Sequence, residues 1–364
     1  MSKQIPSRHK SAPTRMPRWI SRPLSWLYRV GIGFENRRYD RGAGVSKLHF
    51  PVISVGNLSV GGTGKTPMVH WIVRAVQEMN FTPLIAMRGY GAKPGQLSDE
   101  EQVHKETFPD VVVVAQPDRA AGIQAQKESG AEFDAVVLDD GFQHRRIARE
   151  LDLVLIDASH PPFEDALLPR GFLREPISSL VRADAIVITH RELVNDEKLN
   201  EIEAWIHKQV PSCPIAVASH EWSRARRFDW IEDQWATADF RLEEFEGVPV
   251  FATCGIGNPD GFFASIRAAD WDLVSSYVLA DHHPFDVQTI ELILKKMKMS
   301  NSKTIVMTQK DWVKARESFC RTQSYLDSPV SIVVPELGFK FWSGESKIRT
   351  VVQQALCASK SKNF

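Results

Sequence analysis

Short apolar runs recur along the first 220 residues, and polar or glycine-rich segments separate them. Runs of four to eight apolar residues, rich in Val and Ile and bounded by turn residues, are typical of buried β-strands. Seven segments have this composition: 51–55, 82–87, 111–115, 135–138, 151–156, 185–189 and 215–218. Because these runs are continuous rather than alternating, we expect a parallel sheet that helices cover on both faces. The pattern predicts an α/β fold in which ligands bind at the carboxyl ends of the strands.

A second α/β pattern begins at residue 248. Its strand-like and helical segments lie at 248–254, 261–269, 273–279, 287–299, 304–308 and 330–334. Between the two patterns, residues 221–247 alternate aromatic and charged side chains with no helical period, which favours a β-hairpin linker. A chain of 364 residues suits two domains. We therefore predict a basic leading segment at 1–47, a larger domain at 48–220, a two-stranded linker at 221–247 and a smaller α/β domain at 248–364.

The leading segment differs from the rest of the chain in charge. It holds eleven Lys and Arg residues and two acidic residues, a local charge of +9 in a chain whose formal net charge is zero. Residues 19–34 are apolar and aromatic, but Arg22 and Arg29 interrupt them, so neither a membrane span nor a secretory signal is expected. An amphipathic segment that binds an anionic membrane surface fits best. A basic helix packed on the protein itself is an alternative, as is contact with nucleic acid, although no nucleic-acid-binding motif accompanies the charge.

The cysteines exclude one class of fold and one kind of metal site. Four cysteines lie far apart in the sequence, at 213, 254, 320 and 357, and no C-x-x-C pair occurs. This spacing argues against a disulfide framework and a zinc site, and it favours a reducing compartment.

The loop after the first apolar run has the composition of a phosphate-binding loop. Gly61-Gly62-Thr63-Gly64-Lys65-Thr66 lies between that run and an apolar helix. In such loops the backbone N–H groups and the helix N-terminus bind phosphate, the lysine reaches the β- and γ-phosphates, and the hydroxyl ligates Mg²⁺. Ser59 replaces the first glycine of the strict motif, so the loop resembles the G-G-x-G-K-T variant, whose extra lysine is replaced by Val60. We assign residues 59–66 to nucleotide binding; the alternative is a glycine-rich turn without a ligand.

A second part of the predicted site lies at the end of the fourth apolar run. Asp139 follows Ala135–Leu138, and a carboxylate in this position holds Mg²⁺ opposite the loop hydroxyl in P-loop enzymes. Asp140 is able to do the same or to support its neighbour. The alternative is a turn at the strand end, because Asp-Asp-Gly is also turn chemistry.

Together with these two motifs, further segments identify a family. The chain resembles the tetraacyldisaccharide 4'-kinases, the lipid A 4'-kinases of Gram-negative bacteria. The matching segments follow the family's order: VGNLSVGGTGKTP (55–67), RGYG (88–91), DDGFQHRRIARELDLVLID (139–157), LLPRGFLREP (167–176), ADAIVITH (183–190), GIGNPDGFF (255–263), ADHHPF (280–285) and TQKDWVK (308–314).

The resemblance implies both a fold and a reaction. The fold is a P-loop NTPase-type parallel-sheet domain joined by a two-stranded linker to a smaller α/β domain. The reaction uses ATP and Mg²⁺ to phosphorylate the 4'-hydroxyl of a tetraacylated glucosamine disaccharide 1-phosphate, giving lipid IVA. The implied partners are this lipid and an anionic membrane, at the cytoplasmic face of the bacterial inner membrane. We expect a monomer and no nucleic-acid partner.

The resemblance also implies a general base. In the family, an aspartate of a G-D-E-P motif after RGYG takes the hydroxyl proton, helped by a histidine of the second domain. The corresponding residues are Asp99-Glu100, in the polar stretch 93–110, and His282. Ser98 and Glu101 depart from the family's glycine and proline, whereas the acid is retained. From the residues alone, Asp99 would be a solvated charge or a helix cap. A metal site is the alternative for Asp281-His282-His283, but adjacent histidines on a strand point to opposite faces and no third ligand is evident.

Three sets of residues follow from the motifs and the resemblance together. The predicted catalytic residues are Asp99, His282, Lys65 and Asp139. The predicted metal ligands are Thr66, Asp139, Asp140 and Glu100. The candidates for phosphate and substrate contact are Arg88, Arg119, Gln143, His144, Arg170 and Arg174.

Two other functions use the same kind of loop. A regulatory or metal-delivery NTPase would use it as a nucleotide switch, but such proteins usually carry runs of His or Cys. A soluble small-molecule kinase would have no reason for the basic, aromatic leading segment. The sequence therefore favours a kinase that acts on a membrane lipid.

Overall fold

The computed structural model describes residues 16–89, 97–231, 234–256, 259–280, 283–323 and 330–360. The described residues form two compact units. The first contains those within 1–90, 108–220 and 339–364, and the second contains those within 91–107 and 221–338. Two of the points where the chain passes between the units lie inside strands, β7 (Ile215–Ile231) and β12 (Ser331–Ser343).

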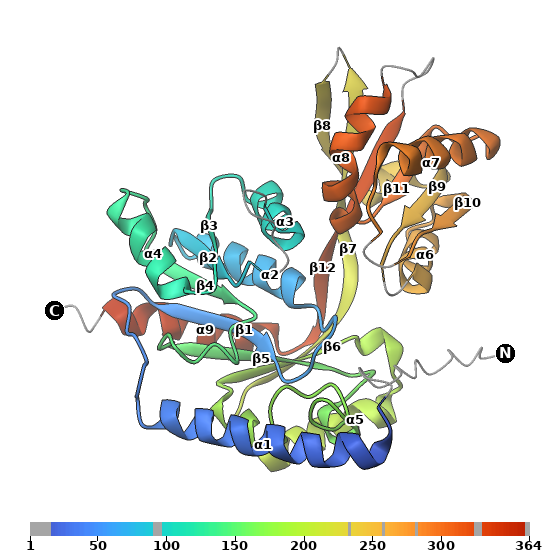
Figure 1. The fold of residues 1–364 in the computed structure, drawn as a ribbon. Helices are drawn as coiled ribbons and strands as arrows, with labels where there is room; N and C mark the ends of the chain where they lie inside the picture. Colours follow the sequence, from blue (N-terminus) through green and yellow to red (C-terminus); the bar gives the residue numbers. More distant parts are fainter. Residues whose placement is uncertain are drawn as a thin grey trace. The chain divides into compact units, whose positions relative to one another are not determined.

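A parallel sheet forms the centre of the first unit (Figure 1). Its strand order is β7-β6-β5-β1-β4-β2-β3, and each strand pairs parallel with its neighbour. The other strands are β1 (Val52–Asn57), β2 (Pro83–Met87), β3 (Val112–Ala115), β4 (Ala135–Asp139), β5 (Leu151–Asp157) and β6 (Ala185–Thr189). Each of the seven predicted runs overlaps one of these strands, so the predicted α/β fold with a parallel sheet is confirmed.

Helices cover both faces of this sheet because its strands are apolar on both sides. On β5, Leu153 and Leu155 belong to one core, and Val154 and Ile156 belong to another, as expected when successive side chains point to opposite faces. The first core includes α2 (Lys65–Glu78) and α9 (Glu345–Lys360). The second includes α5 (Asp196–Gln209), and a third core near β2 and β3 includes α4 (Arg119–Glu128).

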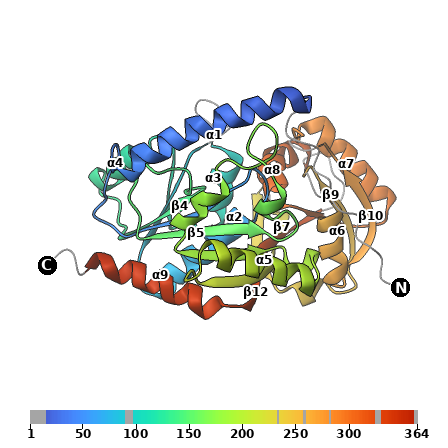
Figure 2. The ribbon, with the colours of Figure 1, turned by 90° about the horizontal axis from the view of Figure 1, so that it is seen from below.

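The long helix α1 (Arg18–Asp40) lies on the same side of the sheet as α5 (Figures 1 and 2). Polar contacts hold it on the unit. The Tyr28 hydroxyl donates to the carbonyl of Arg174 at 2.9 Å, and Asn36 Nδ2 donates to Glu175 Oε2 at 3.0 Å. Short 3₁₀ helices lie in the loops of both units, at Pro162–Glu164, Ile177–Arg182, Arg191–Leu193 and Leu242–Phe245.

The second unit has the strand order β10-β9-β11-β12-β7, and β8 pairs with β7. Its further strands are β8 (Gln234–Phe240), β9 (Pro249–Cys254), β10 (Asp272–Val278) and β11 (Thr304–Met307). The helix α6 (Pro259–Ala268) packs into one core, and α7 (Val287–Met299) and α8 (Gln309–Gln323) pack into another. The helix α3 (Asp99–Thr107) contacts α8.

The units group the chain differently from the contiguous domains that the sequence predicts. Residues 97–107 belong to the second unit because α3 packs on α8. Residues 339–360 belong to the first unit because α9 places Ile348 and Val352 in its core. Within the predicted linker, residues 225–231 pair antiparallel with 234–240. The boundaries at 48, 221 and 248 remain predictions.

Candidate active site

The glycine-rich loop connects β1 to α2 at the carboxyl end of the sheet. Gly64 is the N-cap of α2 and has a φ of +87°, a conformation that favours glycine. A Cβ on Gly64 would clash with His220 Nε2 and lie 2.9 Å from the Phe339 ring, whereas a Cβ on Gly62 would meet no atom within 4 Å. The loop is therefore packed against its own unit on one side and open at Gly62, as an anion-binding loop must be.

Asn57, the last residue of β1, holds the loop from inside. Its Nδ2 donates to the carbonyl of Ser59 at 2.7 Å and to Thr63 Oγ1 at 2.9 Å. Its Oδ1 accepts from Lys65 Nζ at 3.5 Å. Because Asn57 is fully buried, these bonds are shielded from water and fix both ends of the loop. No sequence motif singles out this residue, although a polar side chain at the end of an apolar strand is a usable indication of a site residue.

Two neighbouring segments hold the same loop from outside. The Val60 amide donates to the carbonyl of Phe172 at 2.8 Å. The Thr189 hydroxyl, at the end of β6, donates to the carbonyl of Thr63 at 3.0 Å. The sequence pattern does not indicate Thr189 as a site residue either, because nothing local connects it with a loop 126 residues earlier.

Asp140 lies at the centre of a cluster of cations. Lys65 Nζ is 3.6 Å from its Oδ1, and Arg174 Nη1 is 2.6 Å from its Oδ2. Both terminal nitrogens of Arg119 lie 3.4 Å from its backbone carbonyl. Asp140 itself has a φ of +51°, which is uncommon for a residue other than glycine. Three cations against one partly exposed carboxylate leave an excess of positive charge, which suits a polyanionic ligand.

Asp139 occupies the predicted position beside the loop. It ends β4, is 4% exposed, and is the register partner of Val55 on the neighbouring strand β1. The carboxylates of Asp139 and Asp140 partly offset the free-energy cost of burying the charged guanidinium of Arg119 close to both. Burial lowers the pKa of Arg119, and the two carboxylates raise it. The guanidinium nevertheless stays protonated, and its buried Nε has no hydrogen-bond partner among the described residues.

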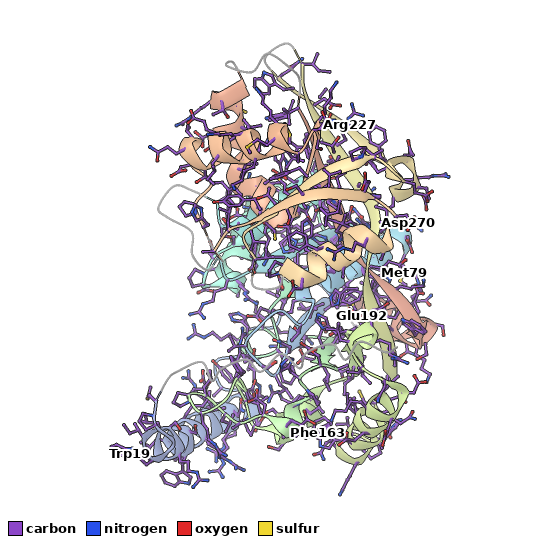
Figure 3. All side chains as sticks on the ribbon, turned by 90° about the vertical axis from the view of Figure 1, so that its right-hand side faces the viewer. Trp19, Met79, Phe163, Glu192, Arg227 and Asp270 are labelled. Carbon is purple, nitrogen blue, oxygen red and sulfur yellow. The ribbon has the colours of Figure 1, made fainter. Side chains whose placement is uncertain are left out.

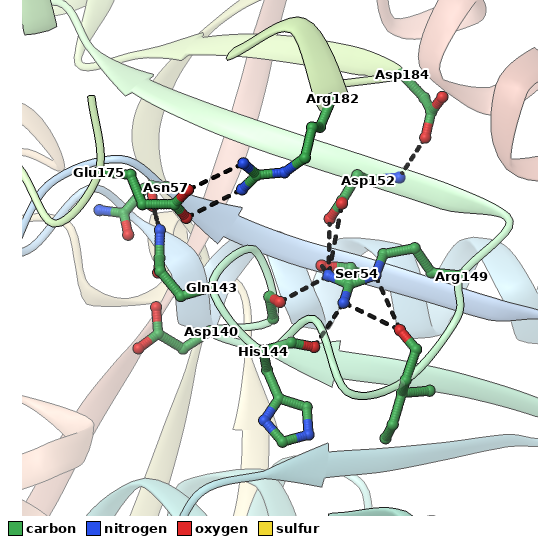
Figure 4. Close-up of polar contacts among 12 residues, drawn as sticks. Ser54, Asn57, Asp140, Gln143, His144, Arg149, Asp152, Glu175, Arg182 and Asp184 are labelled. Carbon is green, nitrogen blue, oxygen red and sulfur yellow. Dashed lines mark hydrogen bonds and ion pairs between the residues drawn. The ribbon is translucent and has the colours of Figure 1, made fainter. Parts of the chain in front are cut away.

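Gln143 and His144 lie on the loop that follows these acids (Figure 4). Gln143 Nε2 donates to the carbonyl of Asn57 at 2.8 Å, and its Oε1 accepts from Arg174 Nη1 at 3.4 Å. Burial, together with the nearby guanidinium of Arg119, lowers the pKa of His144 to about 4. His144 is therefore neutral at neutral pH.

These residues fit a nucleotide triphosphate with Mg²⁺. Mg²⁺ takes most of its ligands from phosphate oxygens and water and needs only one or two protein oxygens. Thr66, in the first turn of α2, and Asp139, at the end of β4, are suitable donors. Within the part of the chain that the structure describes, no group of three or more His, Cys, Asp or Glu residues could hold a metal ion.

The remaining predicted site residues are Asp99, Glu100, Arg88, Arg170 and His282. Asp99 and Glu100 form the first turn of α3 in the second unit, where Lys314 Nζ is 2.9 Å from Asp99 Oδ2 and Lys310 Nζ is 3.5 Å from Glu100 Oε1. The side chains of Arg88 and Arg170 are exposed. His282 lies outside the described residues.

The outer side of α1 is apolar and basic. Trp19, Trp26, Leu27 and Phe34 are 76%, 64%, 58% and 67% exposed. Trp19 lies near the start of the helix, at the edge of the first unit (Figure 3). Arginines 22, 29, 37 and 38 are also exposed. Among the helices in the described ranges, none is both long and apolar enough to cross a membrane.

Comparisons with known proteins show the family of the chain. The family model described as Tetraacyldisaccharide-1-P 4'-kinase matches residues 17–356. The chain belongs to this family. The tetraacyldisaccharide 4'-kinase of Chlorobaculum parvum is 32% identical over 324 residues, which cover 84% of this chain and 86% of the relative. That of Pseudomonas fluorescens is 33% identical over 351 residues, with 93% and 94% covered.

A solved structure of this family has the same fold. The crystal structure of the "apo" form LpxK from Aquifex aeolicus in complex with ATP matches with a TM-score of 0.67 and 26% sequence identity. The match covers 92% of this chain and 98% of that one. The family assignment made from the sequence motifs is thus confirmed.

Proposed function

We propose that this chain is an ATP- and Mg²⁺-dependent kinase that transfers the γ-phosphate to the 4'-hydroxyl of tetraacyldisaccharide 1-phosphate, forming lipid IVA. Membership of the tetraacyldisaccharide-1-P 4'-kinase family over residues 17–356 carries the proposal. The glycine-rich loop with Lys65 beside Asp140 supports it, because this cluster provides the phosphate-binding charges that such a transfer needs.

In this proposal the cations of the first unit bind and orient the phosphates. Lys65, Arg119 and Arg174 surround Asp140 and supply positive charge for the β- and γ-phosphates. Thr66 and Asp139 would hold Mg²⁺, which when bound neutralises the charge that develops between those phosphates. Asn57 and Thr189 keep the loop amides in place before the nucleotide arrives.

Asp99 is the proposed proton acceptor for the 4'-hydroxyl, with His282 assisting. The ion pair with Lys314 orients the Asp99 carboxylate, whose side chain is 44% exposed and so accessible to a substrate hydroxyl. Glu100 would contribute to the metal side of the same site. Arg88 and Arg170, with exposed side chains, are the proposed contacts for the lipid's own phosphate.

We further propose that α1 binds the cytoplasmic face of the bacterial inner membrane. The polar side of the helix is held on the protein through Tyr28 and Asn36, so its aromatic and basic side is available to the lipid headgroups. This placement suits a lipid substrate with four acyl chains. Such an acceptor stays in the bilayer, so the enzyme must reach it at the membrane surface.

Transfer of label from [γ-³²P]ATP to the lipid disaccharide tests the proposal. We expect labelled lipid with the wild type and a loss of about 10²- to 10³-fold in rate with Lys65→Ala, which removes one transition-state cation. Asp99→Ala should lose turnover far more than ATP affinity. A matched control is Lys198→Ala, at a lysine paired with Glu201 on α5. An enzyme that hydrolyses ATP but leaves the lipid unlabelled would instead be a nucleotide switch.

A further inference from the structure

One partly buried arginine, Arg149, contacts the loop 140–147 only through backbone carbonyls. Arg149 Nη1 donates to the carbonyl of Gly141 at 2.8 Å, and Nη2 donates to those of His144 and Ile147 at 2.5 and 3.0 Å. Its Nε donates to the carbonyl of Ile147 at 3.2 Å. Figure 4 shows these bonds converging on one guanidinium group. A single side chain therefore closes the loop that follows Asp139 and Asp140.

The remaining contacts of Arg149 anchor it to the sheet. Nη1 lies 3.4 Å from Asp152 Oδ1, on β5, and 3.5 Å from Ser54 Oγ, on β1. Asp152 is in turn fixed by its backbone amide, which donates to Asp184 Oδ2 at 2.7 Å. The guanidinium thus joins two central strands to the loop, and its five donors are used in one planar arrangement.

The loop that Arg149 holds carries side chains of the phosphate site. Asp140 binds Lys65 and Arg174, and Gln143 binds the carbonyl of Asn57 beside the glycine-rich loop. Among the hydrogen bonds and ion pairs of the described residues, none joins Arg149 to these side chains, so it acts on them through the backbone of the loop. Space is also tight here, because a Cβ on Gly141 would lie 2.5 Å from Ser54 Oγ.

We propose that Arg149 is a positioning residue for phosphoryl transfer: its guanidinium fixes the backbone of residues 141–147 and so orients the Asp139-Asp140 carboxylates toward Mg²⁺. The inference rests on the proposed function, since it assigns these carboxylates to a metal–nucleotide complex. Groups that orient metal ligands typically change metal affinity 10- to 100-fold when they are removed.

Two substitutions separate this role from simple stabilisation of the fold. Arg149→Lys keeps the positive charge beside Asp152, but an ammonium group cannot span three carbonyls as the planar guanidinium does. Asp152→Asn removes the ion pair and leaves the carbonyl contacts of Arg149 in place. A matched control is Arg191→Lys, at an arginine that donates to the carbonyl of Val194 at 2.7 Å and pairs with Asp196.

The measurements are made on the full chain. Binding of ADP in EDTA reports the glycine-rich loop, and electron paramagnetic resonance of Mn²⁺ in the ADP complex reports the metal ligands. Hydrogen exchange of residues 141–147 in the nucleotide-free protein reports the loop itself. Thermal unfolding gives the stability of each variant.

We expect Arg149→Lys to weaken Mn²⁺ binding about 10- to 100-fold, to speed exchange at residues 141–147 and to leave ADP binding in EDTA unchanged. Asp152→Asn and Arg191→Lys should lower the melting temperature at most and leave Mn²⁺ affinity intact. Unchanged Mn²⁺ affinity in a folded Arg149→Lys variant would overturn the proposal. A wild type that binds Mn²⁺–ADP but never labels the lipid would contradict the proposed function and not the role of Arg149.

A second comparison applies if Arg149→Lys does not fold. Arg149→Gln is then made in the Asp152→Asn background, so that no buried carboxylate is left without a counter-charge. Weaker Mn²⁺ binding than in Asp152→Asn alone supports the proposal, and equal binding overturns it.

Discussion

At the scale of single residues, the site depends on one carboxylate shared among cations. Asp140 contacts Lys65 and Arg174 through its two oxygens and Arg119 through its carbonyl. In the absence of a nucleotide this carboxylate takes the place of a phosphate in neutralising the cluster. Its removal should therefore affect nucleotide binding and catalysis in opposite directions.

Asp140→Asn tests that expectation. Without the carboxylate, Lys65 and Arg174 face the phosphates with their full charge, so metal-free ATP should bind about two- to fivefold more tightly, as expected for a partly exposed ion pair. Label transfer to the lipid should fall, because a predicted metal ligand is lost. Calorimetric titration in EDTA gives the affinity; weaker binding of metal-free ATP would contradict this account of the cluster.

His144 gives a prediction for stability and pH. Burial and the neighbouring arginines hold its pKa at about 4 in the folded chain, against about 6.5 when unfolded. The folded state thus prefers the neutral ring. This contribution to stability is complete above pH 6.5 and is lost as the pH falls toward 4. The melting temperature of the wild type should drop more between pH 7 and pH 5 than that of His144→Gln; parallel curves would exclude this role.

At the scale of elements, two glycines of the turn from β1 into α2 differ in their surroundings. Gly62 has open space around it, and Gly64 is closely packed. Gly62→Ala meets no neighbour, whereas Gly64→Ala requires a strained φ and displaces His220. We expect Gly64→Ala to lose at least about 1–2 kcal/mol of unfolding free energy together with ATP binding, and Gly62→Ala to keep the wild-type melting temperature. Urea unfolding of the pair measures this, and equal stabilities would contradict the packing described for Gly64.

One side of the helix α1 is anchored to the protein and the other side is exposed. Substitutions on the exposed side test whether it binds a membrane. Trp26→Ala and Phe34→Ala should each weaken sedimentation with anionic vesicles severalfold, because up to about 1.5–3 kcal/mol accompanies full burial of a large apolar side chain. Added salt should weaken binding further by screening the arginines. Trp342→Ala, at a tryptophan that is 62% exposed outside this helix, is the matched control and should bind like the wild type.

At the scale of the whole molecule, each unit is built from separate parts of the sequence. The first unit is completed by α9, whose Ile348 and Val352 are fully buried beside α2. Ile348→Ala should lower the unfolding free energy by about 2–4 kcal/mol, although it lies far along the sequence from the glycine-rich loop. Lys347→Ala, at the adjacent exposed residue, should change it little. Denaturant unfolding compares the two, and similar values would show that α9 contributes little to this core.

The sequence predicted what depends on local pattern and missed what depends on long-range contact. The strands were recognisable because apolar runs end in turn residues, and Lys65 and Asp139 because strand, loop and helix are consecutive. The helix α3 lies in a stretch that the sequence pattern indicates only as polar. Most of its residues are charged or polar, and its packing partner α8 follows about 200 residues later. Arg149 and Asn57 bind groups close to them in the sequence, such as His144 and Thr63, but the loop conformations that make these bonds do not follow from the pattern of residues.

The central claim is that the bound nucleotide's γ-phosphate goes to a sugar hydroxyl of a membrane lipid. The most direct measurement follows the label from [γ-³²P]ATP in vesicles containing tetraacyldisaccharide 1-phosphate and compares the label in lipid with the label in inorganic phosphate. We predict that the label accumulates in a bisphosphorylated lipid whose new phosphate is at the 4' position. Label recovered only as inorganic phosphate, with the lipid unchanged, would contradict the account.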